Sequence, residues 1–293
     1  MMKRLKKKIR KLKSSLFYDT EKMMRDIYDF CQNEMIIRQK ADFTNNARFQ
    51  YYRTVHQILN IKQIVSPKSS FKRIGREYDG GYVMNYSEEF GFSSAKTAYS
   101  FGINNDVSWD MDMAIAGYQI YQYDPTIKSL PIKHQNFHWK CLGLIGGGVK
   151  DNYKTLKEIM KDNNHETING AVLKMDIEGF EWEVFANCSR DIMNRFDQIV
   201  MEVHSLTNME KADIIVKALQ NIANTHQIVH IHPNNIAFVS HCGNLLMPDT
   251  LELTFVKKDI FQFEDCDVFL PIDIDMPGID FIPEIKLGYW NRI

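Results

Sequence analysis

Two apolar, strand-like segments of the sequence end in residues that can carry acid–base chemistry. The first runs into Asp176 and Glu178, and the second runs into Glu202 and His204. Alternate residues of a strand share one face, so the two members of each pair point the same way. Carboxylates and a histidine that converge on one crevice are typical of general acid–base catalysis or of a metal site. A structural role would also explain two of these residues. Glu178 would cap the positive N-terminal end of the following helix, and His204 would be a histidine packed in the interior without a catalytic role.

A glycine and an acid at the ends of two earlier strands indicate a nucleoside ligand. Gly102 ends one strand, and Asp124 ends the next strand 22 residues later. An acid at about this distance from a glycine turn usually holds ribose hydroxyls. We therefore expect Gly102 to let the backbone approach the ligand and Asp124 to accept hydrogen bonds from the ribose. Each residue alone is also a common turn residue, so this interpretation depends on the pair.

The turn after Gly102 distinguishes between nucleoside cofactors. A dinucleotide needs a GxGxxG turn, because its pyrophosphate lies against a bare helix N-terminus. This turn lacks those glycines and has Asp106 and Asp110 instead. Acids repel a diphosphate but suit an amine and a sulfonium. The turn therefore favours S-adenosylmethionine over NAD.

Short apolar strands alternate with helices from about residue 97 onward. The expected strands are Thr97–Ile103, Gln119–Tyr123, Phe137–Leu142, Ala171–Ile177, Gln198–His204, Gln227–His232 and Leu251–Lys257. The expected helices are Ser108–Ala116, Tyr153–Lys161, Phe180–Asn187 and Met209–Ile222. This alternation predicts an α/β, doubly wound fold with a mainly parallel, seven-stranded sheet and helices on both faces. The last two strands are joined by a loop rather than a long helix, which predicts an antiparallel final strand.

The composition is that of a globular protein. Apolar residues make up 44% and charged residues 25% of the 293 residues, which excludes a disordered chain and a fibrous repeat. No apolar run approaches the ~18 residues that span a bilayer. The five cysteines show no CxxC spacing, which favours a reducing compartment and disfavours structural zinc. We expect a cytoplasmic protein without a signal peptide.

The charges are unevenly distributed along the chain. Residues 1–13 carry eight Lys or Arg and no acid, and Leu5, Ile9, Leu12 and Leu16 form one stripe of an amphipathic helix. This arm, residues 1–16, could pack on its own chain or on a second copy of the chain. It could instead lie on the anionic inner face of the membrane, or bind nucleic acid. The rest of the chain is acidic and would repel nucleic acid, so we expect no nucleic-acid partner.

The chain divides into three expected parts. Residues 1–66 form a basic helical extension, because periodic helix-like residues continue to a boundary at Pro67. Residues 67–258 form the main domain. Residues 259–293 hold eight acids and two basic residues, and we expect this tail to wrap the domain. Attraction between the tail and the basic arm of a second chain would give a homo-oligomer.

The motifs resemble those of the FkbM-related, methyltransferase-like class of S-adenosylmethionine enzymes. The resemblance covers roughly residues 70–258 and rests on these segments: Arg73-x-Gly75, Asp79-Gly80-Gly81-Tyr82, Tyr99-Ser100-Phe101-Gly102-Ile103, Tyr123-Asp124-Pro125, Leu173-Lys174-Met175-Asp176-Ile177-Glu178-Gly179 and Glu202-Val203-His204. Relatives often carry Gly-Asp-Asp where this chain has Asn104-Asn105-Asp106. Asparagine tolerates the left-handed conformation, so we expect the turn to be kept.

The resemblance implies a Rossmann-like class I methyltransferase fold and an O-methyltransferase that uses S-adenosylmethionine. It places cofactor contacts at Gly102, Asn105, Asp106, Asp124 and Tyr82. Similar bacterial enzymes with a basic, helical N-terminus are encoded with capsule or lipopolysaccharide sugar genes. By this analogy the acceptor is a sugar hydroxyl, on a nucleotide-linked sugar such as a heptose.

A sugar hydroxyl needs a base, because it is a poor nucleophile while protonated. We expect His204 to be that base, oriented by Glu202, with Asp176 binding the acceptor or helping to deprotonate it. Glu178 and His232 are the expected substrate contacts. In the alternative arrangement, Asp176, Glu202 and His204 hold Mg²⁺, which would polarise the hydroxyl. The rival functions are a non-enzymatic nucleoside-binding assembly module and a methyltransferase for another small molecule or a protein.

Overall fold

The computed structural model describes residues 46–292. The described residues fall into two units, one of residues 46–50 with Cys242–Asn244 and one of Tyr51–His241 with residues 245–292. The second unit holds the sheet and the predicted site residues. The predicted amphipathic arm, residues 1–16, lies outside the described residues.

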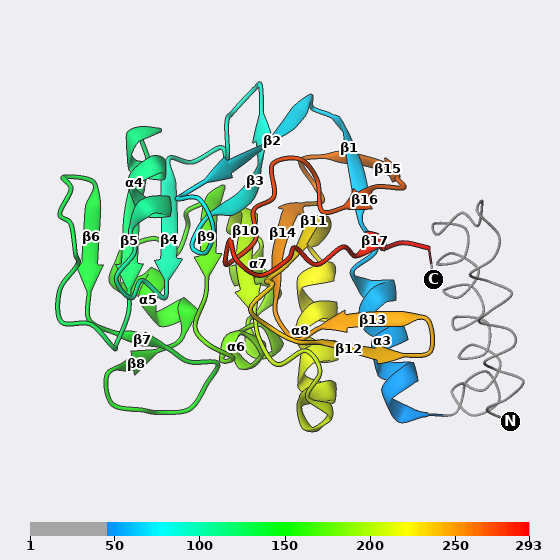
Figure 1. Cartoon of the computed structure of the whole chain (residues 1–293). Helices are drawn as coiled ribbons and strands as arrows, with labels where there is room; N and C mark the ends of the chain where they lie inside the picture. Colours follow the sequence, from blue (N-terminus) through cyan, green and yellow to red (C-terminus); the bar gives the residue numbers. More distant parts are fainter. Residues whose placement is uncertain (1–45, 293) are drawn as a thin grey trace, which may run out of the picture. The chain divides into compact units, whose positions relative to one another are not determined.

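A seven-stranded sheet with the order β11-β14-β10-β9-β4-β5-β6 forms the centre of the second unit (Figure 1). Its strands are β4 (Thr97–Phe101), β5 (Gln119–Tyr123), β6 (Phe137–Lys140), β9 (Ala171–Met175), β10 (Phe196–Val203), β11 (His226–Pro233) and β14 (Leu251–Lys257). All neighbouring pairs whose register is given are parallel, apart from the two pairs that β14 makes with β10 and β11. The predicted α/β class, the seven strands and the antiparallel final strand are confirmed.

The order of the strands reverses between β4 and β9. From β4 the chain continues to β5 and β6 on one side, and it then returns to add β9 and β10 on the other side. Phe101 of β4 is paired with Met175 of β9, so the two strands end side by side. Ligands of open α/β sheets bind beyond such a switch point. The topology therefore brings Gly102 and Asp176 together.

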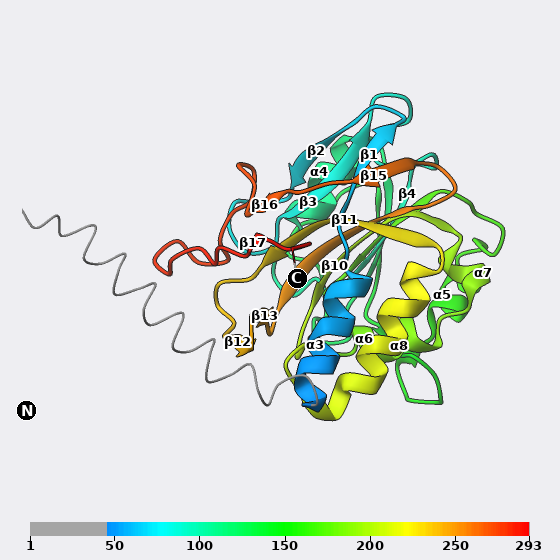
Figure 2. The same cartoon turned by 90° about the vertical axis from the view of Figure 1, so that its right-hand side faces the viewer.

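Different kinds of element cover the two faces of the sheet (Figure 2). One face carries the helices α6 (Glu181–Asn187) and α8 (Ala212–Ala223), which pack against each other. The opposite face carries α4 (Ser108–Ile115) together with a hairpin of β2 (Ser69–Ile74) and β3 (Tyr82–Ser87). Helices therefore cover both faces as expected, and the hairpin takes part of one face. The shorter helical elements are α5 (Leu156–Asp162), α7 (Arg190–Met193) and the 3₁₀ helix η1 (Met209–Lys211).

Local sequence explains these elements. The buried residues of α8 are Ile215, Ala218, Leu219 and Ile222, whose spacing puts them on one helical stripe against the core. In β2 exposed and partly buried residues alternate, as expected for an outer strand. The Asp79-Gly80-Gly81 turn precedes β3, and the two glycines allow the chain to reverse tightly there.

The segments before and after the main sheet contact each other. After α3 (Ala47–Ile58), β1 (Lys62–Ser66) pairs with β15 (Gln262–Asp265), so the last residues of the expected helical extension form a strand. The ring of His56 stacks on that of Trp290 with 3.8 Å between centroids. The remaining short strands are β7 (Gly143–Leu144), β8 (Tyr153–Lys154), β12 (Val239–Cys242), β13 (Leu245–Pro248), β16 (Phe269–Leu270) and β17 (Gly288–Tyr289).

Among residues 46–292, no helix has the length and apolar character needed to cross a membrane.

Candidate active site

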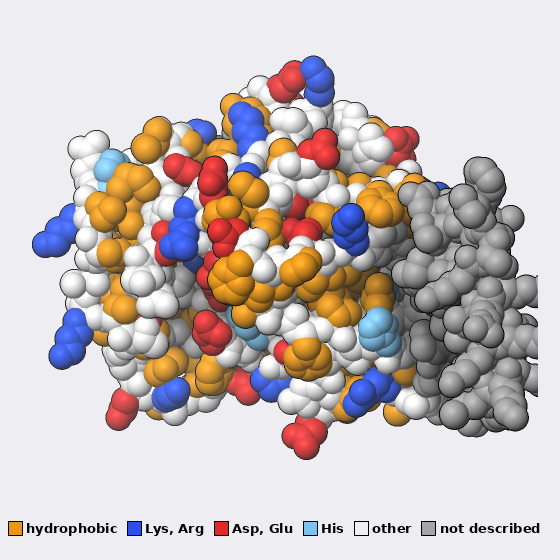
Figure 3. Space-filling view, in the orientation of Figure 1, with side chains coloured by type: hydrophobic (Ala, Val, Ile, Leu, Met, Phe, Trp, Pro, Cys, Tyr) orange, Lys and Arg blue, Asp and Glu red, His pale blue; other side chains and the backbone are white. Residues whose placement is uncertain are grey.

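A cavity of about 840 Å³ opens at the carboxyl ends of β4, β5, β9 and β10. Its volume lies within the range of about 300–1,000 Å³ that is usual for ligand pockets. Acidic side chains gather near the middle of this face of the molecule (Figure 3). The predicted site residues that line the cavity are Gly102, Asn105, Asp106, Asp124, Asp176, Glu178, Glu202 and His204.

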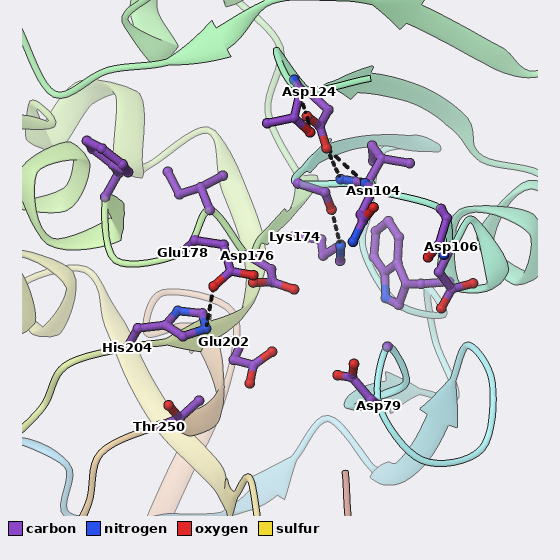
Figure 4. Close-up of a pocket in the computed structure, with 18 of the residues that line it drawn as sticks. Asp79, Asn104, Asp106, Asp124, Lys174, Asp176, Glu178, Glu202, His204 and Thr250 are labelled. Carbon is purple, nitrogen blue, oxygen red and sulfur yellow. Dashed lines mark hydrogen bonds and ion pairs between the residues drawn. The ribbon is translucent and has the colours of Figure 1, made fainter. Parts of the chain in front are cut away.

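The cavity has two ends (Figure 4). Asp124, Asn104 and Asp106 lie around one end, and His204, Glu202 and Thr250 lie around the other. We call these the Asp106 end and the His204 end. Asp176 lies between them, at the end of β9.

Position 102 requires a glycine because the backbone at the end of β9 passes very close to it. Its φ of 78° lies in the left-handed region. A Cβ at this position would lie 1.5 Å from the carbonyl oxygen of Asp176. The absence of a side chain at Gly102 therefore leaves room for the backbone at the end of β9. The sequence predicted only that it would leave room for a ligand.

Asp124 organises the turn after β4. One carboxylate oxygen accepts hydrogen bonds from the backbone N–H groups of Ile103 and Asn104, both at 2.8 Å. The other accepts from the N–H and the hydroxyl of Thr126, at 2.7 and 2.5 Å. Burial raises the pKa of Asp124, but these hydrogen bonds outweigh it and lower the pKa overall. A carboxylate has about four lone-pair sites, so these bonds engage the whole group and Asp124 shapes the turn.

Two acids and a tight turn form the Asp106 end. Asn104 adopts a φ of 48°, the left-handed conformation that the sequence predicted for this turn. The Asp106 carboxylate accepts a hydrogen bond from the N–H of Ser108 at 2.9 Å. A Cβ on Gly80 would lie 2.3 Å from the same carboxylate, so the loop before β3 closes over this end and brings Asp79 into the lining.

Asp176 lines the cavity, and its two carboxylate oxygens differ in their hydrogen bonding. The buried hydroxyl of Tyr82 donates to Oδ2 at 3.2 Å. Oδ1 is buried and has no partner among the described residues. Burial raises the pKa of Asp176, although Lys174 and His204 oppose the rise. Tyr82 therefore holds Asp176 in place and does not itself line the cavity.

Glu202 is the second buried acid of the site. It is 6% exposed, and its Oε1 accepts a hydrogen bond from the side-chain amide of Asn234 at 2.8 Å. Burial and the nearby charges of Asp176 and Glu252 raise the pKa of Glu202 to about 8. Two buried carboxylates whose charges repel each other do not both ionise readily at neutral pH.

His204 is held by acids other than the predicted one. Its ring nitrogens lie 3.4 Å from Glu181 and 3.6 Å from Glu178. Burial alone would lower the pKa of His204. The pairing with Glu181 and the charge of Glu202 outweigh burial and raise the pKa to about 9. An imidazolium at neutral pH has no free lone pair, which disfavours the predicted general-base role and favours a carboxylate in that role.

Replacing Glu181 with glutamine should change the titration of His204. We expect the ring of wild-type His204 to titrate with a midpoint near pH 9, and the Glu181→Gln variant to lower this midpoint by roughly one pH unit or more. NMR of the ring protons measures both values. Glu183→Gln, on the exposed face of the same helix, is the matched control and should leave the midpoint unchanged. A midpoint near 6.5 in the wild type would contradict the prediction.

The donor atoms do not fit the predicted Mg²⁺ site. Among the described residues, one cluster has ligand atoms close enough to hold an ion, all within 4.8 Å of one another. Its members are Asp176, His204 and Glu181, so Glu181 takes the place that was predicted for Glu202. The carboxylate of Glu181 is already bonded to the N–H groups of Ile177 and Gly179. Mg²⁺ prefers six oxygen ligands, whereas this cluster offers two carboxylates and an imidazole nitrogen.

Two predicted residues lie away from the cavity lining. Tyr82 acts on Asp176 as described above. His232 is 0% exposed and lies between Glu252, at 3.2 Å, and Glu284, at 3.4 Å. His232 is therefore a buried structural group in this fold and is not among the lining residues that could touch a substrate.

The sequence patterns predict no role for Lys174 or Asn234. Lys174 is 6% exposed, and its Nζ donates to the carbonyl oxygen of Gly102 at 2.7 Å. A lysine within an otherwise apolar strand is the signal that could have identified it, because a buried charge needs a partner. Asn234 follows β11 in a polar run, a pattern that does not distinguish it from an ordinary loop residue.

Comparisons with known proteins give a family match and two curated relatives. The model of the methyltransferase FkbM domain matches residues 73–245. Two curated relatives are named "Probable methyltransferase-like protein 24". The Homo sapiens protein is 29% identical over 118 residues and the Rattus norvegicus protein 25% identical over 118 residues. Each match covers 36% of this chain and 32% of the relative, so the chain spans about a third of the length of these relatives.

A solved structure from Streptococcus mutans, named as a candidate S-adenosylmethionine-dependent methyltransferase, is 11% identical with a TM-score of 0.34. The match covers 65% of this chain and 56% of that chain. The family model, in contrast, matches more than half of this chain and includes the ends of β4, β5, β9 and β10 that form the cavity. The chain therefore belongs to the methyltransferase FkbM domain family.

Proposed function

We propose that the protein transfers a methyl group from S-adenosylmethionine to a sugar hydroxyl, on a nucleotide-linked sugar used for capsule or other surface polysaccharide. The observation that carries the proposal is the carboxylate of Asp176, which lines the cavity between its two ends and whose buried Oδ1 has no hydrogen-bond partner among the described residues. A buried carboxylate oxygen in this position can take a proton from an acceptor hydroxyl.

The Asp106 end fits a cationic nucleoside cofactor. Asp79, Asp106 and Asp110 line the cavity there, and their carboxylates suit an amine and a sulfonium. The turn held by Asp124 would accommodate the nucleoside beside Gly102. When bound, S-adenosylmethionine supplies an electrophilic methyl group on a sulfonium centre.

The His204 end supplies the groups that hold the acceptor and receive its proton. Asp176 accepts the hydroxyl proton at Oδ1, while Tyr82 fixes the carboxylate through Oδ2. Glu202 orients the acceptor through a hydrogen bond to a neighbouring hydroxyl. The positive charge of His204 stabilises the ionised form of Asp176. Aligning the two substrates in one cavity supplies much of the rate enhancement of a two-substrate reaction.

Calorimetric titration of S-adenosylhomocysteine into the purified protein tests the cofactor assignment. We expect wild-type protein to bind with a dissociation constant in the micromolar range. Asp124→Ala removes the acceptor of four hydrogen bonds that shape the turn, so the affinity should fall about tenfold or more. Asp151→Ala, at an exposed position away from the cavity lining, should bind like the wild type.

Failure of the wild type to bind either S-adenosylhomocysteine or S-adenosylmethionine would contradict the proposed function and favour an assembly module. If binding is found, transfer of a labelled methyl group to free sugars and to nucleotide-linked sugars tests the acceptor. Methylation of a protein or of a small molecule other than a sugar, with no sugar accepted, would refute the sugar assignment.

A further inference from the structure

The segment Asp275–Glu284 near the C-terminus lies against two loops that line the cavity. The carbonyl oxygen of Gly278 accepts a hydrogen bond from the N–H of Asp79 at 3.3 Å. The side-chain amide of Asn235 donates to the carbonyl oxygens of Ile279 and Ile282, at 2.9 and 2.7 Å. The N–H of Ile279 donates back to Asn235 at 3.0 Å. This segment lies beyond the region that the family model matches.

Contacts between a histidine and a carboxylate anchor both ends of the segment. His230 of β11 lies 2.8 Å from Asp275, and both side chains are at most 4% exposed. His232 lies 3.4 Å from Glu284. Separating Asp275 from His230 would leave a buried carboxylate without its hydrogen-bond partner, which is energetically costly. The segment is therefore a fixed part of the fold at this edge of the cavity.

Gly278 packs directly on the side chain that holds Glu202. A Cβ on Gly278 would lie 2.6 Å from Oδ1 and 3.3 Å from Nδ2 of Asn234. Asn234 is 6% exposed, and its amide is held on two sides. It donates to Glu202 at 2.8 Å and accepts from the N–H of Ile236 at 2.9 Å. The amide therefore has little room to move away from an added methyl group.

We propose that Gly278 and Asn234 are positioning residues for Glu202, and that the Asp275–Glu284 segment thereby completes the acceptor end of the cavity. The inference rests on the proposed function, because that function gives Glu202 its role toward the acceptor. The backbone of Gly278 supports the Asn234 amide from one side, and the amide orients the Glu202 carboxylate into the cavity. The same backbone fixes Asp79 on the opposite wall.

Gly278→Ala is the first variant to test. We expect the added methyl group to displace the Asn234 amide, and the NMR resonances of its side-chain NH₂ group to shift as its hydrogen bond to Glu202 weakens. The KM for the acceptor should rise about tenfold, while the affinity for S-adenosylhomocysteine stays within twofold of the wild type. A merely structural role would lower the amount of active protein, and hence kcat, without changing the acceptor KM. Gly147→Ala, where a Cβ would meet nothing within 4 Å, is the matched control.

A double-mutant cycle tests whether Gly278 acts through Asn234. Asn234→Ala should raise the acceptor KM at least as much as Gly278→Ala does. In the Asn234→Ala background, the change at Gly278 should have almost no further effect, because the group that it displaces is gone. Additive effects of the two changes would overturn the inference. So would unchanged Asn234 resonances in Gly278→Ala.

The outcomes separate this inference from the proposed function. The NMR measurement needs no acceptor, so it reports on the Gly278–Asn234–Glu202 contact whether or not methyl transfer is found. Absence of methyl transfer in the wild type would refute the proposed function. Normal wild-type transfer with an unchanged acceptor KM in Gly278→Ala would refute this inference alone.

Discussion

Replacing Asp176 with asparagine is expected to lower the rate of methyl transfer by about 10²–10⁴-fold, the usual contribution of a general base. Asparagine has the same shape and keeps an oxygen that can accept the hydrogen bond from Tyr82. Its amide cannot take a proton from the acceptor. The fold and the affinity for S-adenosylhomocysteine should therefore stay close to those of the wild type, while turnover is lost.

The pH dependence of the wild type gives a second readout. Burial raises the pKa of Asp176, and a base works only when ionised. The rate should therefore increase with pH through a midpoint above the ordinary range of an aspartic acid, and this rise should be absent from the residual activity of Asp176→Asn. Asp151→Asn, at an exposed position, is the control for both measurements. Full activity in Asp176→Asn would exclude Asp176 as the base.

Gly102→Ala should be the most destabilising single substitution at the cavity. The new Cβ would lie 1.5 Å from the carbonyl oxygen of Asp176, and a backbone atom cannot rotate away as a side chain does. The residue would also keep a φ of 78° that disfavours alanine. We expect a loss of at least about 3 kcal/mol in the free energy of unfolding. At about 2–4 °C per kcal/mol, this corresponds to a fall in Tm of roughly 6–12 °C or more.

Gly117→Ala separates the two causes of this loss. Gly117 also has a positive φ, 91°, but a Cβ there would meet nothing within 4 Å. It should therefore lose only about 1–2 kcal/mol, from backbone strain alone. Thermal unfolding of both variants measures the difference. Equal falls in Tm would show that the close approach of β9 to Gly102 contributes nothing.

The sequence predicts the sheet well because its information is local. Each strand is a short apolar run, and the last two strands of the sheet are joined by a loop region without a long helix, which favours their antiparallel pairing. The left-handed turn at Asn104 is also predictable from residue type. The sequence does not predict that the β2–β3 hairpin covers the sheet. Exposed and partly buried residues alternate in β2, and this alternation does not indicate which surface the hairpin contacts.

The partners of the site residues depend on long-range packing. The sequence pairs His204 with Glu202 by strand alternation, whereas the start of α6 brings Glu181 to the imidazole. The contact between Asn234 and Gly278 joins residues 44 positions apart through an irregular segment without periodicity. Chemistry-bearing residues can thus be identified from strand ends, but their protonation states follow only from the folded arrangement.

The buried ammonium of Lys174 links the two ligand sites by one charge. It binds the carbonyl oxygen of Gly102 at 2.7 Å, and it also lowers the pKa of Asp176. In the proposed function, a cofactor that polarises the Gly102 turn and an acceptor that draws on Asp176 would therefore compete for the same ammonium. Linkage requires such an effect to be reciprocal, so each ligand changes the affinity for the other by the same factor. In the proposed function, a single side chain within a β-strand would thus couple the affinities of the two substrates electrostatically.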